Sequence, residues 1–251
     1  MRDRSPPFTV VSDAGVVPAF VSTRSVVFDE DAAEDPSTLF PMVHLPEAVR
    51  RAAPRRQLAF LAGRYCAQRA LHLRDVAWDA DTLGVGEGGA PLWPADIVGS
   101  ITHTRGFASA AVGSRSSVAA VGIDSEEIMS QSQADEVRRS IVTPDELEES
   151  SPSSRARELL TVAFSAKESV YKCLYPLVRR WFDYLDASVT LEPDPVDDSR
   201  GVFLATLKVA LSPELDVGTQ LRGRFVVDAR YVHTGVVWGV RDPARGADSR
   251  P

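Results

Sequence analysis

The chain has 251 residues, 44% of them hydrophobic and 25% charged, a composition typical of globular proteins. Its formal net charge of -7 argues against a nucleic-acid-binding protein, because duplex binding relies on a dominant positive field to neutralise phosphates. No stretch approaches the ~20 apolar residues of a membrane span, and no apolar run of signal length opens the sequence. The sequence therefore predicts a cytoplasmic protein that binds neither nucleic acid nor a membrane.

The first half of the chain is expected to combine strands with one long helix. Residues 16–28 alternate enough to predict a strand, and residues 29–46, rich in Asp, Glu and Pro, indicate a loop. A helix is expected over 54–73, because a proline suits its first turn and apolar residues then recur at helical spacing. Arg56 and Arg64 fall within roughly 80° of each other on such a helix, so they can serve one anionic site.

A glycine-rich stretch opens the middle of the chain. Residues 84–94 indicate an irregular loop, and apolar strands are predicted at 107–112 and 118–123. The turn between these strands, at 113–117, favours a hairpin.

The second half is expected to contain another helix and several late strands. Residues 130–154 are polar and acidic with a helix start at Thr143-Pro144, and an apolar helix is predicted over 155–174. Antiparallel strands are predicted at 202–211, 221–227 and 232–240. The tail after Asp242 is expected to be disordered.

Strands and helices mix without a regular β-α-β alternation, which favours the α+β class over a doubly wound sheet. Each half offers a helix and strands, and the most reasonable boundary lies between residues 113 and 123. We therefore divide the chain into an N-terminal half, residues 1–118, and a C-terminal half, residues 119–251.

Two carboxylates follow an apolar strand in the segment 122–126, GIDSE. Side chains two apart on a strand point the same way, so Asp124 and Glu126 are expected side by side. Adjacent like charges are unfavourable without a cation between them, and hard oxygen ligands of this kind suit Mg²⁺. The competing interpretation is a solvated acidic strand end, because Glu127 extends the charge run.

A second segment, residues 164–172 (FSAKESVYK), contains two of the three lysines, Lys167 and Lys172. On a helix Glu168 and Lys172 are i,i+4 neighbours, and a surface ion pair between them is one explanation of the spacing. The other explanation is a functional site. The scarcity of lysine in a chain that relies on arginine favours that second explanation.

A third segment, residues 99–104 (GSITHT), precedes an apolar strand. His103 is either a loop residue without a role or part of a site, and its place between a Trp-Pro loop and a strand favours a site. The two cysteines, Cys66 and Cys173, offer neither a metal cluster nor a disulfide framework and are expected to be buried free thiols.

Together these segments resemble the signatures of the phosphopantetheinyl transferases, in the long, pseudo-dimeric subclass that serves siderophore, polyketide and peptide synthesis. The resemblance rests on residue identity and order and covers about residues 56–175. Its elements are Gly63-Arg64 with Ala67 and Ala70-Leu71, Gly89 with Pro91 and Trp93-Pro94, Gly99-Ser100 with Thr102-His103, then GIDSE and FSAKESVYK. The last two strings, in this order, are the specific part.

The resemblance implies an enzyme that moves the 4'-phosphopantetheine of coenzyme A to a serine of an apo acyl or peptidyl carrier protein, releasing adenosine 3',5'-bisphosphate. It also implies two similar α/β halves related by pseudo-twofold symmetry, with coenzyme A in the cleft between them. The N-terminal half is then the adenosine side and the C-terminal half the Mg²⁺ and catalytic side. A monomer is expected, because one chain supplies both halves of the cleft.

By the same resemblance, Asp124, Glu126 and Glu168 hold Mg²⁺ against the pyrophosphate. Glu168, directly or through a water, takes the proton from the carrier serine. Lys167 and Lys172 contact phosphate oxygens, with Lys172 nearest the transferred group.

Arg56, Arg64 and His103 match family positions that grip the 3'-phosphate and adenosine end of coenzyme A, and the planar fork of arginine binds phosphate bidentately. The sequence departs from the family at Gly88-Gly89, where many relatives carry a basic residue. A phosphate contact is then missing there or is replaced by another arginine.

The carrier-binding rim is the least legible part of the sequence. Arg179, Arg180, Trp181 and Phe182 are candidates, unless they are the ordinary core and surface of a helix end. Two other functions stay open. One is a Mg²⁺-dependent hydrolase of nucleotide pyrophosphates, and the other is a catalytically idle coenzyme A binding module.

Overall fold

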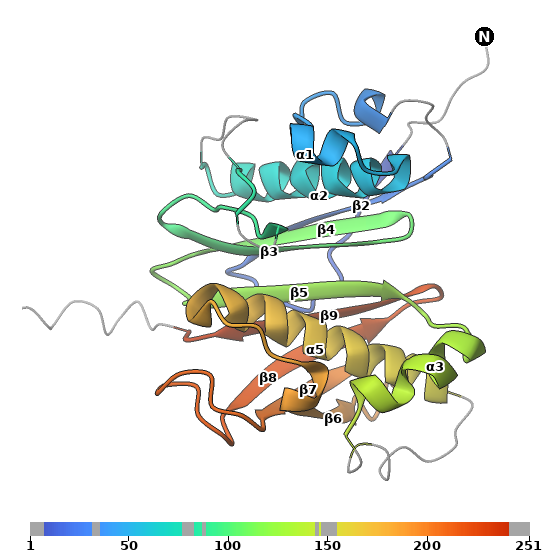
Figure 1. The fold of residues 1–251 in the computed structure, drawn as a ribbon, viewed down its shortest axis with the longest axis vertical. Coiled ribbons are helices and arrows are strands. Elements are labelled where there is room, and N and C mark those ends of the chain that lie inside the picture. Colours follow the sequence, from blue (N-terminus) through green and yellow to red (C-terminus); the bar gives the residue numbers. More distant parts are fainter. Residues whose placement is uncertain are drawn as a thin grey trace, which may run out of the picture.

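The structure, a computed structural model, describes residues 8–31, 36–76, 83–86, 89–143, 146 and 155–240. These residues form two antiparallel sheets, each covered by one long helix (Figure 1). The expected α+β class is confirmed. Within these ranges no helix has both the length and the apolar character of a membrane-crossing segment.

The N-terminal half contains a four-stranded sheet in the order β1-β2-β4-β3. Its elements are β1 (Phe8–Val11), β2 (Ser22–Phe28), a 3-10 turn (Pro36–Thr38), α1 (Glu47–Arg50), α2 (Pro54–His72), β3 (Ile97–Thr104) and β4 (Phe107–Ser114). Helix α2 begins at Pro54, as the sequence predicts, because the first turn needs no amide donor there. Its buried residues Leu58 and Leu61 pack against Val26 and Ala108 of the sheet.

The C-terminal half contains a five-stranded sheet in the order β5-β9-β8-β7-β6. Its elements are β5 (Ala120–Glu127), α3 (Gln131–Ile141), α5 (Ala156–Val178), a 3-10 turn (Tyr184–Asp186), β6 (Ala187–Pro193), β7 (Arg200–Leu207), β8 (Gln220–Val227) and β9 (Tyr231–Trp238). Helix α3 starts at a capping box, in which Ser130 and Gln133 satisfy each other's backbone amides.

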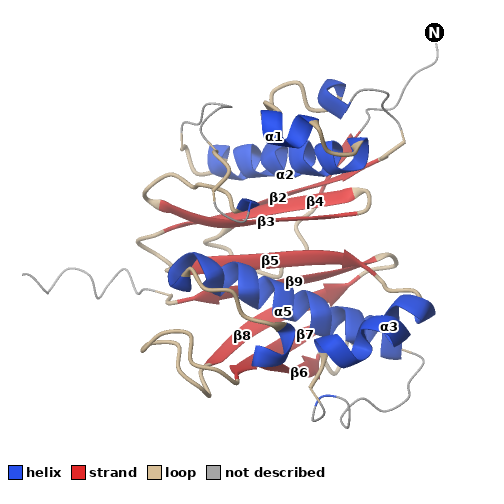
Figure 2. Cartoon of the chain, in the orientation of Figure 1, coloured by secondary structure: helices blue, strands red, loops and turns tan. Residues whose placement is uncertain are grey.

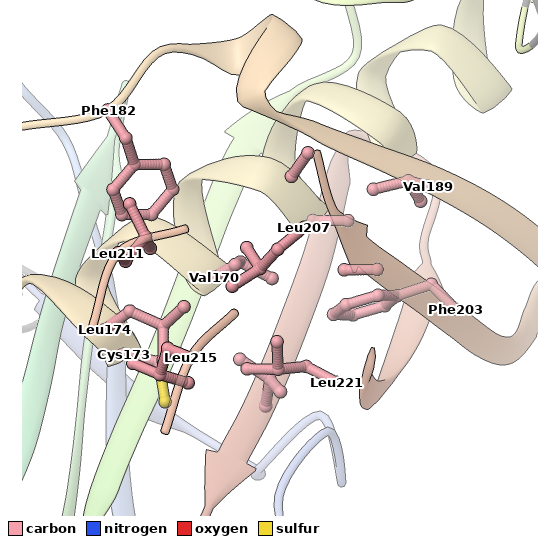
Figure 3. Close-up of a cluster of buried hydrophobic side chains, with 14 of the residues drawn as sticks. Val170, Cys173, Leu174, Phe182, Val189, Phe203, Leu207, Leu211, Leu215 and Leu221 are labelled. Atoms are coloured by element: carbon pink, nitrogen blue, oxygen red, sulfur yellow. The ribbon is translucent and has the colours of Figure 1, made fainter. Parts of the chain in front are cut away.

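The largest buried cluster lies between α5 and the C-terminal sheet (Figure 3). Val170, Cys173 and Leu174 of α5 pack there with Phe203 and Leu207 of β7. Burial of apolar side chains of this size contributes about 1.5–3 kcal/mol each, so this cluster fixes the position of α5 on its sheet.

The two sheets pack against each other in the middle of the molecule, with α2 and α5 on the outside (Figure 2). Val98 and Ala111 of the N-terminal sheet meet Val121 and Ile123 of β5 in a separate buried cluster. Edge strand β3 thereby lies beside edge strand β5, although the two belong to different sheets.

The predicted hairpin over 107–123 is wrong, because β4 and β5 lie in different sheets. Strand β4 pairs instead with β3 across a tight turn at Gly106, whose φ of 70° favours glycine. Strand β3 was not predicted, because one of its faces is polar and it contains few apolar residues. The expectations for Pro144, for Gly88 and for the tail after Asp242 lie outside the described residues.

Candidate active site

Three hydroxyl groups of β3 cover the free edge of β5. Ser100, Thr102 and Thr104 alternate along β3 and therefore share one face of the strand. The amides of alternate β5 residues donate to them, at 3.1 Å (Ile123 to Ser100), 3.0 Å (Ser125 to Thr102) and 3.4 Å (Glu127 to Thr104). An edge strand leaves such amides unpaired, so these three residues, the hydroxyl ladder, join the two halves and satisfy the edge.

The hydroxyl ladder also orients the two carboxylates of the GIDSE segment. Thr102 Oγ1 donates to Asp124 Oδ1 at 3.1 Å, and Thr104 Oγ1 donates to Glu126 Oε2 at 3.4 Å. Each of these two threonine hydroxyls thus accepts from the backbone of β5 and donates to the side chain of the preceding residue. The packing of the two halves therefore sets the orientation of both acids.

Helix α5 brings a third acid and a lysine to the same place. A Cβ atom on Gly122 of β5 would lie 1.9 Å from the carbonyl oxygen of Ser169, so α5 rests directly on the strand backbone. From α5, Lys172 Nζ donates to Asp124 Oδ1 at 2.5 Å, while Glu168 Oε1 accepts from Tyr184 Oη at 2.5 Å. The surface pair between Glu168 and Lys172 does not form, so that explanation of the spacing is excluded.

Negative charge is in excess in this group, which we call the acid cluster: Asp124, Glu126 and Glu168. Burial, then Asp124 and Glu168, raises the pKa of Glu126 to about 8, although Lys172 and Thr104 oppose the shift. Burial alone would lower the pKa of Lys172, but the neighbouring acids outweigh it and raise that pKa. Asp124 Oδ2 is buried and has no hydrogen-bond partner among the described residues.

The acid cluster is not a preformed metal cage. Within the part of the chain that the structure describes, no three His, Cys, Asp or Glu side chains are arranged to hold a metal ion. Lys172 and Tyr184 occupy one oxygen of Asp124 and one of Glu168. A cation would have to compete with these two partners, and the vacant Asp124 Oδ2 gives it a first ligand.

His103 and Arg56 lie beside the acid cluster on the N-terminal half. His103 points to the α2 side of β3, where a Cβ on Gly63 would lie 4.0 Å from its ring. Packing around the ring, and then the charges of Lys172 and Arg56, lower the pKa of His103. The side chain is nevertheless exposed, as is Arg56 at the start of α2, so both are open to a ligand.

Two predicted phosphate contacts do not join the acid cluster. Arg64 is buried and donates to the carbonyl oxygens of Leu83 at 3.0 Å and Gly84 at 3.4 Å, so it does not share an exposed cationic face with Arg56. Burial lowers the pKa of Arg64 to about 10. The sequence predicts that the two arginines can serve one anionic site, whereas in the structure Arg64 is turned to residues 83 and 84.

Lys167 is likewise turned away from the acid cluster. Its amine is buried and donates to the carbonyl oxygen of Ile141 at 2.7 Å and to Glu146 Oε2 at 2.9 Å. Glu146 Oε1 in turn accepts the amide of Val189 at 2.7 Å. The lysine therefore ties α5 to the end of α3 and to β6 rather than facing a phosphate.

A cavity of about 160 Å³ opens next to Glu168. Half of its lining residues are aromatic, and the full set is Lys167, Glu168, Tyr171, Trp181, Phe182, Asp183, Tyr184 and Ala187. Trp181 is 67% exposed, whereas Phe182 is buried in the C-terminal core and is not part of a rim. Among the candidates for a carrier surface, Arg179, Arg180 and Trp181 are exposed.

Sequence reasoning missed two features of this region. Tyr184, the partner of Glu168, stands sixteen positions away, a separation with no periodic signal. His233 Nδ1 lies 2.9 Å from Ser125 Oγ, and its Nε2 lies 3.4 Å from Asp228 Oδ2. This order matches a hydrolytic triad, but Ser125 is 3% exposed and cannot reach a substrate.

Two family models match the chain. Residues 45–113 match the 4'-phosphopantetheinyl transferase N-terminal domain, and residues 120–214 match the 4'-phosphopantetheinyl transferase superfamily. A solved holo-(acyl-carrier-protein) synthase from Bacillus anthracis, in complex with CoA (3',5'-ADP), aligns with a TM-score of 0.32 and 19% identity over 48% of this chain and 96% of that one. That alignment is too weak to carry an argument.

Relatives that align over nearly their whole length show the family instead. The chain is 30% identical to 4'-phosphopantetheinyl transferase Npt of Nocardia iowensis and 32% identical to PptT of Mycobacterium tuberculosis, in both cases over 89% of this chain and 98% of the relative. It is 40% identical to enterobactin synthase component D of Salmonella typhi over 59% of each chain. The chain belongs to the 4'-phosphopantetheinyl transferase family.

Proposed function

We propose that this chain transfers the 4'-phosphopantetheine of coenzyme A to a serine of an apo acyl or peptidyl carrier protein. The observation that carries the proposal is the arrangement of α5 over β5. Lys172 bonds to Asp124 across two elements instead of pairing with Glu168 on its own helix. A lysine held in this way on α5 is suited to a polyanionic substrate.

The acid cluster fits a divalent cation such as Mg²⁺. The orphaned oxygen of Asp124 and the raised pKa of Glu126 both indicate uncompensated negative charge that a cation would offset. Carboxylate oxygens are the ligands that Mg²⁺ prefers, and we assign Asp124, Glu126 and Glu168 to it. When bound, Mg²⁺ would neutralise pyrophosphate charge and stabilise the leaving group.

The residues of the chain then have distinct tasks. The serine oxygen of the carrier attacks the phosphorus that bears pantetheine, and the bond from this phosphorus to adenosine 3',5'-bisphosphate breaks. Glu168 accepts the serine proton, directly or through a water. Lys172 stabilises charge on the phosphoryl oxygens, and His103 and Arg56 hold the 3'-phosphate end from the N-terminal half.

The aromatic cavity beside Glu168 supplies a place for the pantetheine arm. Tyr171 and Trp181 give it apolar walls. Arg179 and Arg180, which precede Trp181 in the chain, are exposed with it, and the three would offer an acidic carrier a basic and apolar surface. We further propose that the enzyme works as a monomer in the cytoplasm, since one chain supplies both sides of the cleft. Its two cysteines are free and buried, which accords with a reducing compartment.

The test is to incubate the protein with coenzyme A, Mg²⁺ and apo carrier proteins of several classes and to measure carrier mass. Transfer should add the phosphopantetheine mass, and folded Asp124→Asn and Glu168→Gln variants should lose it. Glu127→Gln is the matched control, because this acid neighbours the cluster but pairs with Arg230. No mass gain with any carrier would reject the proposal, and coenzyme A cleavage without a carrier would favour a hydrolase.

A further inference from the structure

Among the described residues outside α5, β3 and β5, Tyr184 is the one that forms a hydrogen bond to the acid cluster. Its phenol donates to Glu168 Oε1 at 2.5 Å, within the range of charge-assisted O–H···O⁻ bonds. No other described residue donates to Glu168, so Oε2 is the oxygen left open. The two oxygens of this carboxylate are therefore not equivalent.

The backbone around Tyr184 is fixed by local hydrogen bonds. Asp183 Oδ1 accepts the amide of Tyr184 at 2.7 Å, and Asp186 Oδ2 accepts the amide of Asp183 at 2.8 Å. The carbonyl oxygen of Asp186 also accepts the amide of Lys208 at 2.8 Å. On either side of this turn, Phe182 and Ala187 are buried in the C-terminal core. The turn thus presents the phenol at one place.

The ring of Tyr184 is held as well. It packs against Phe164 with ring centroids 5.4 Å apart. Phe164 and Glu168 are i,i+4 neighbours on α5, so one face of the helix supports the ring and accepts the bond from its hydroxyl. The phenol has little freedom to leave Glu168 without breaking this packing.

The consequence concerns Lys172, the other i,i+4 neighbour of Glu168. An unrestrained glutamate four residues before a lysine on a helix pairs with it readily. Here no ion pair joins them, because Lys172 bonds to Asp124 and Glu168 bonds to Tyr184. Tyr184 holds Glu168 Oε1 and so restrains the carboxylate from turning toward the lysine.

We infer that Tyr184 is a positioning residue, which holds Glu168 Oε1 so that Oε2 faces the reaction and Lys172 stays free for phosphate. This inference rests on the proposed function for what Glu168 does, but not for where Glu168 lies. Removal of the phenolic hydroxyl should let the carboxylate turn toward Lys172. Glu168 and Lys172 would then pair with each other, and neither would be free to accept the proton or to bind phosphate.

The kinetic test is Tyr184→Phe, which keeps the ring and its contact with Phe164. We expect kcat for transfer to fall roughly 10- to 100-fold, the range for loss of a hydrogen bond to a charged group, with KM for coenzyme A changed less than about threefold. Tyr175→Phe is the matched control, since Tyr175 stacks on Tyr171 on the same helix but bonds no member of the acid cluster. It should match the wild type. A Tyr184→Phe enzyme with wild-type kcat would overturn the inference.

A crystal structure of the metal-free Tyr184→Phe protein gives a readout that needs no activity. The inference expects Glu168 within ion-pairing distance of Lys172, and a carboxylate that keeps its wild-type position would overturn it. This measurement separates the two proposals. A wild-type protein that modifies no carrier rejects the proposed function, whereas the position of Glu168 in the variant still decides the role of Tyr184.

Discussion

In each half, a glycine permits close approach between the long helix and the edge strand that faces the other half. In the N-terminal half the glycine is on the helix: a Cβ on Gly63 of α2 would lie 2.7 Å from Ile101 Cγ2, a side-chain atom of β3. In the C-terminal half it is on the strand: a Cβ on Gly122 of β5 would lie 1.9 Å from the backbone oxygen of Ser169 in α5.

This difference separates a fixed half from an adjustable one. Backbone rests on backbone in the C-terminal half, so Glu168 and Lys172 have one position relative to Asp124. In the N-terminal half a side chain lies between helix and strand, and the ligand-facing residues Arg56 and His103 are exposed. Under the proposed function, this difference would place the chemistry in the C-terminal half and the binding of substrate in the N-terminal half.

The sharpest test of that assignment pairs Lys172→Ala with Arg56→Ala. If Lys172 stabilises charge that develops during transfer, as proposed, its loss should lower kcat about 10²–10³-fold, as for other transition-state donors, with a small change in KM. If Arg56 binds substrate and transition state alike, its loss should raise KM for coenzyme A about 3- to 10-fold and leave kcat unchanged. Steady-state transfer kinetics measure both. Equal effects on kcat from the two variants would contradict the division.

The same comparison predicts a large loss of stability for one glycine-to-alanine substitution and a small one for another. Gly122→Ala must push α5 off its strand, and we expect a loss of about 3 kcal/mol or more in unfolding free energy, or ~6–12 °C in Tm. Gly63→Ala meets only a side chain, and better helix propensity, worth ~1 kcal/mol, offsets that contact. Thermal unfolding followed by circular dichroism distinguishes them. A Gly122→Ala protein as stable as Gly63→Ala would show that α5 is not fixed by backbone contact.

The sequence was most informative where residue type and spacing carry the chemistry. Helix α2 begins at the predicted proline, and Asp124, Glu126, Glu168 and Lys172 do converge from β5 and α5. Identity of these residues in two short strings sufficed, because the strand and the helix that hold them are both strongly patterned.

Prediction failed where tertiary contacts reverse a local pattern. The hydroxyls on one face of β3 bind the backbone of β5 rather than water or a core. The sequence of this strand is therefore rich in small polar residues and resembles that of a loop. Lys167 looked equivalent to Lys172, yet five positions on a helix turn the side chain to another face, where Glu146 binds it. Tyr184 approaches from a separate turn, which no spacing rule can indicate.

The hydroxyl ladder offers a third test, with a conservative rescue. Thr102→Val keeps the shape of the side chain but leaves the Ser125 amide without an acceptor and leaves Asp124 Oδ1 with Lys172 as its one remaining donor among the described residues. An unsatisfied buried amide costs about 1–3 kcal/mol, so we expect a Tm lower by ~2–6 °C and a weaker response of transfer to Mg²⁺. Thr102→Ser retains the hydroxyl and should restore both. If the valine and serine variants behave alike, the Thr102 hydroxyl contributes neither to stability nor to the response to Mg²⁺.

The smallest expected effect is the most specific to the acid cluster. The pKa of Glu126 is raised from 4.5 to about 8 without a metal, so the folded protein favours the neutral acid. The stability that this gives is fully present below the ordinary pKa of the group and is lost as pH rises toward about 8. Glu126→Gln stays neutral and avoids this loss. In metal-free buffer its Tm should therefore exceed that of the wild type increasingly with pH, by ~2–4 °C near pH 8.

With Mg²⁺ and coenzyme A present, the order of stability should reverse. The ionised carboxylate of the wild type can bind the cation, whereas the neutral amide of glutamine offers it no negative charge. Glu127→Gln, one residue along β5 and paired with Arg230, should follow the wild type in both buffers. Thermal melts across pH with and without the two ligands measure this reversal. If Glu126→Gln and wild type melt together at every pH, the charge of Glu126 is already compensated, and the fixed C-terminal half has no need of a cation.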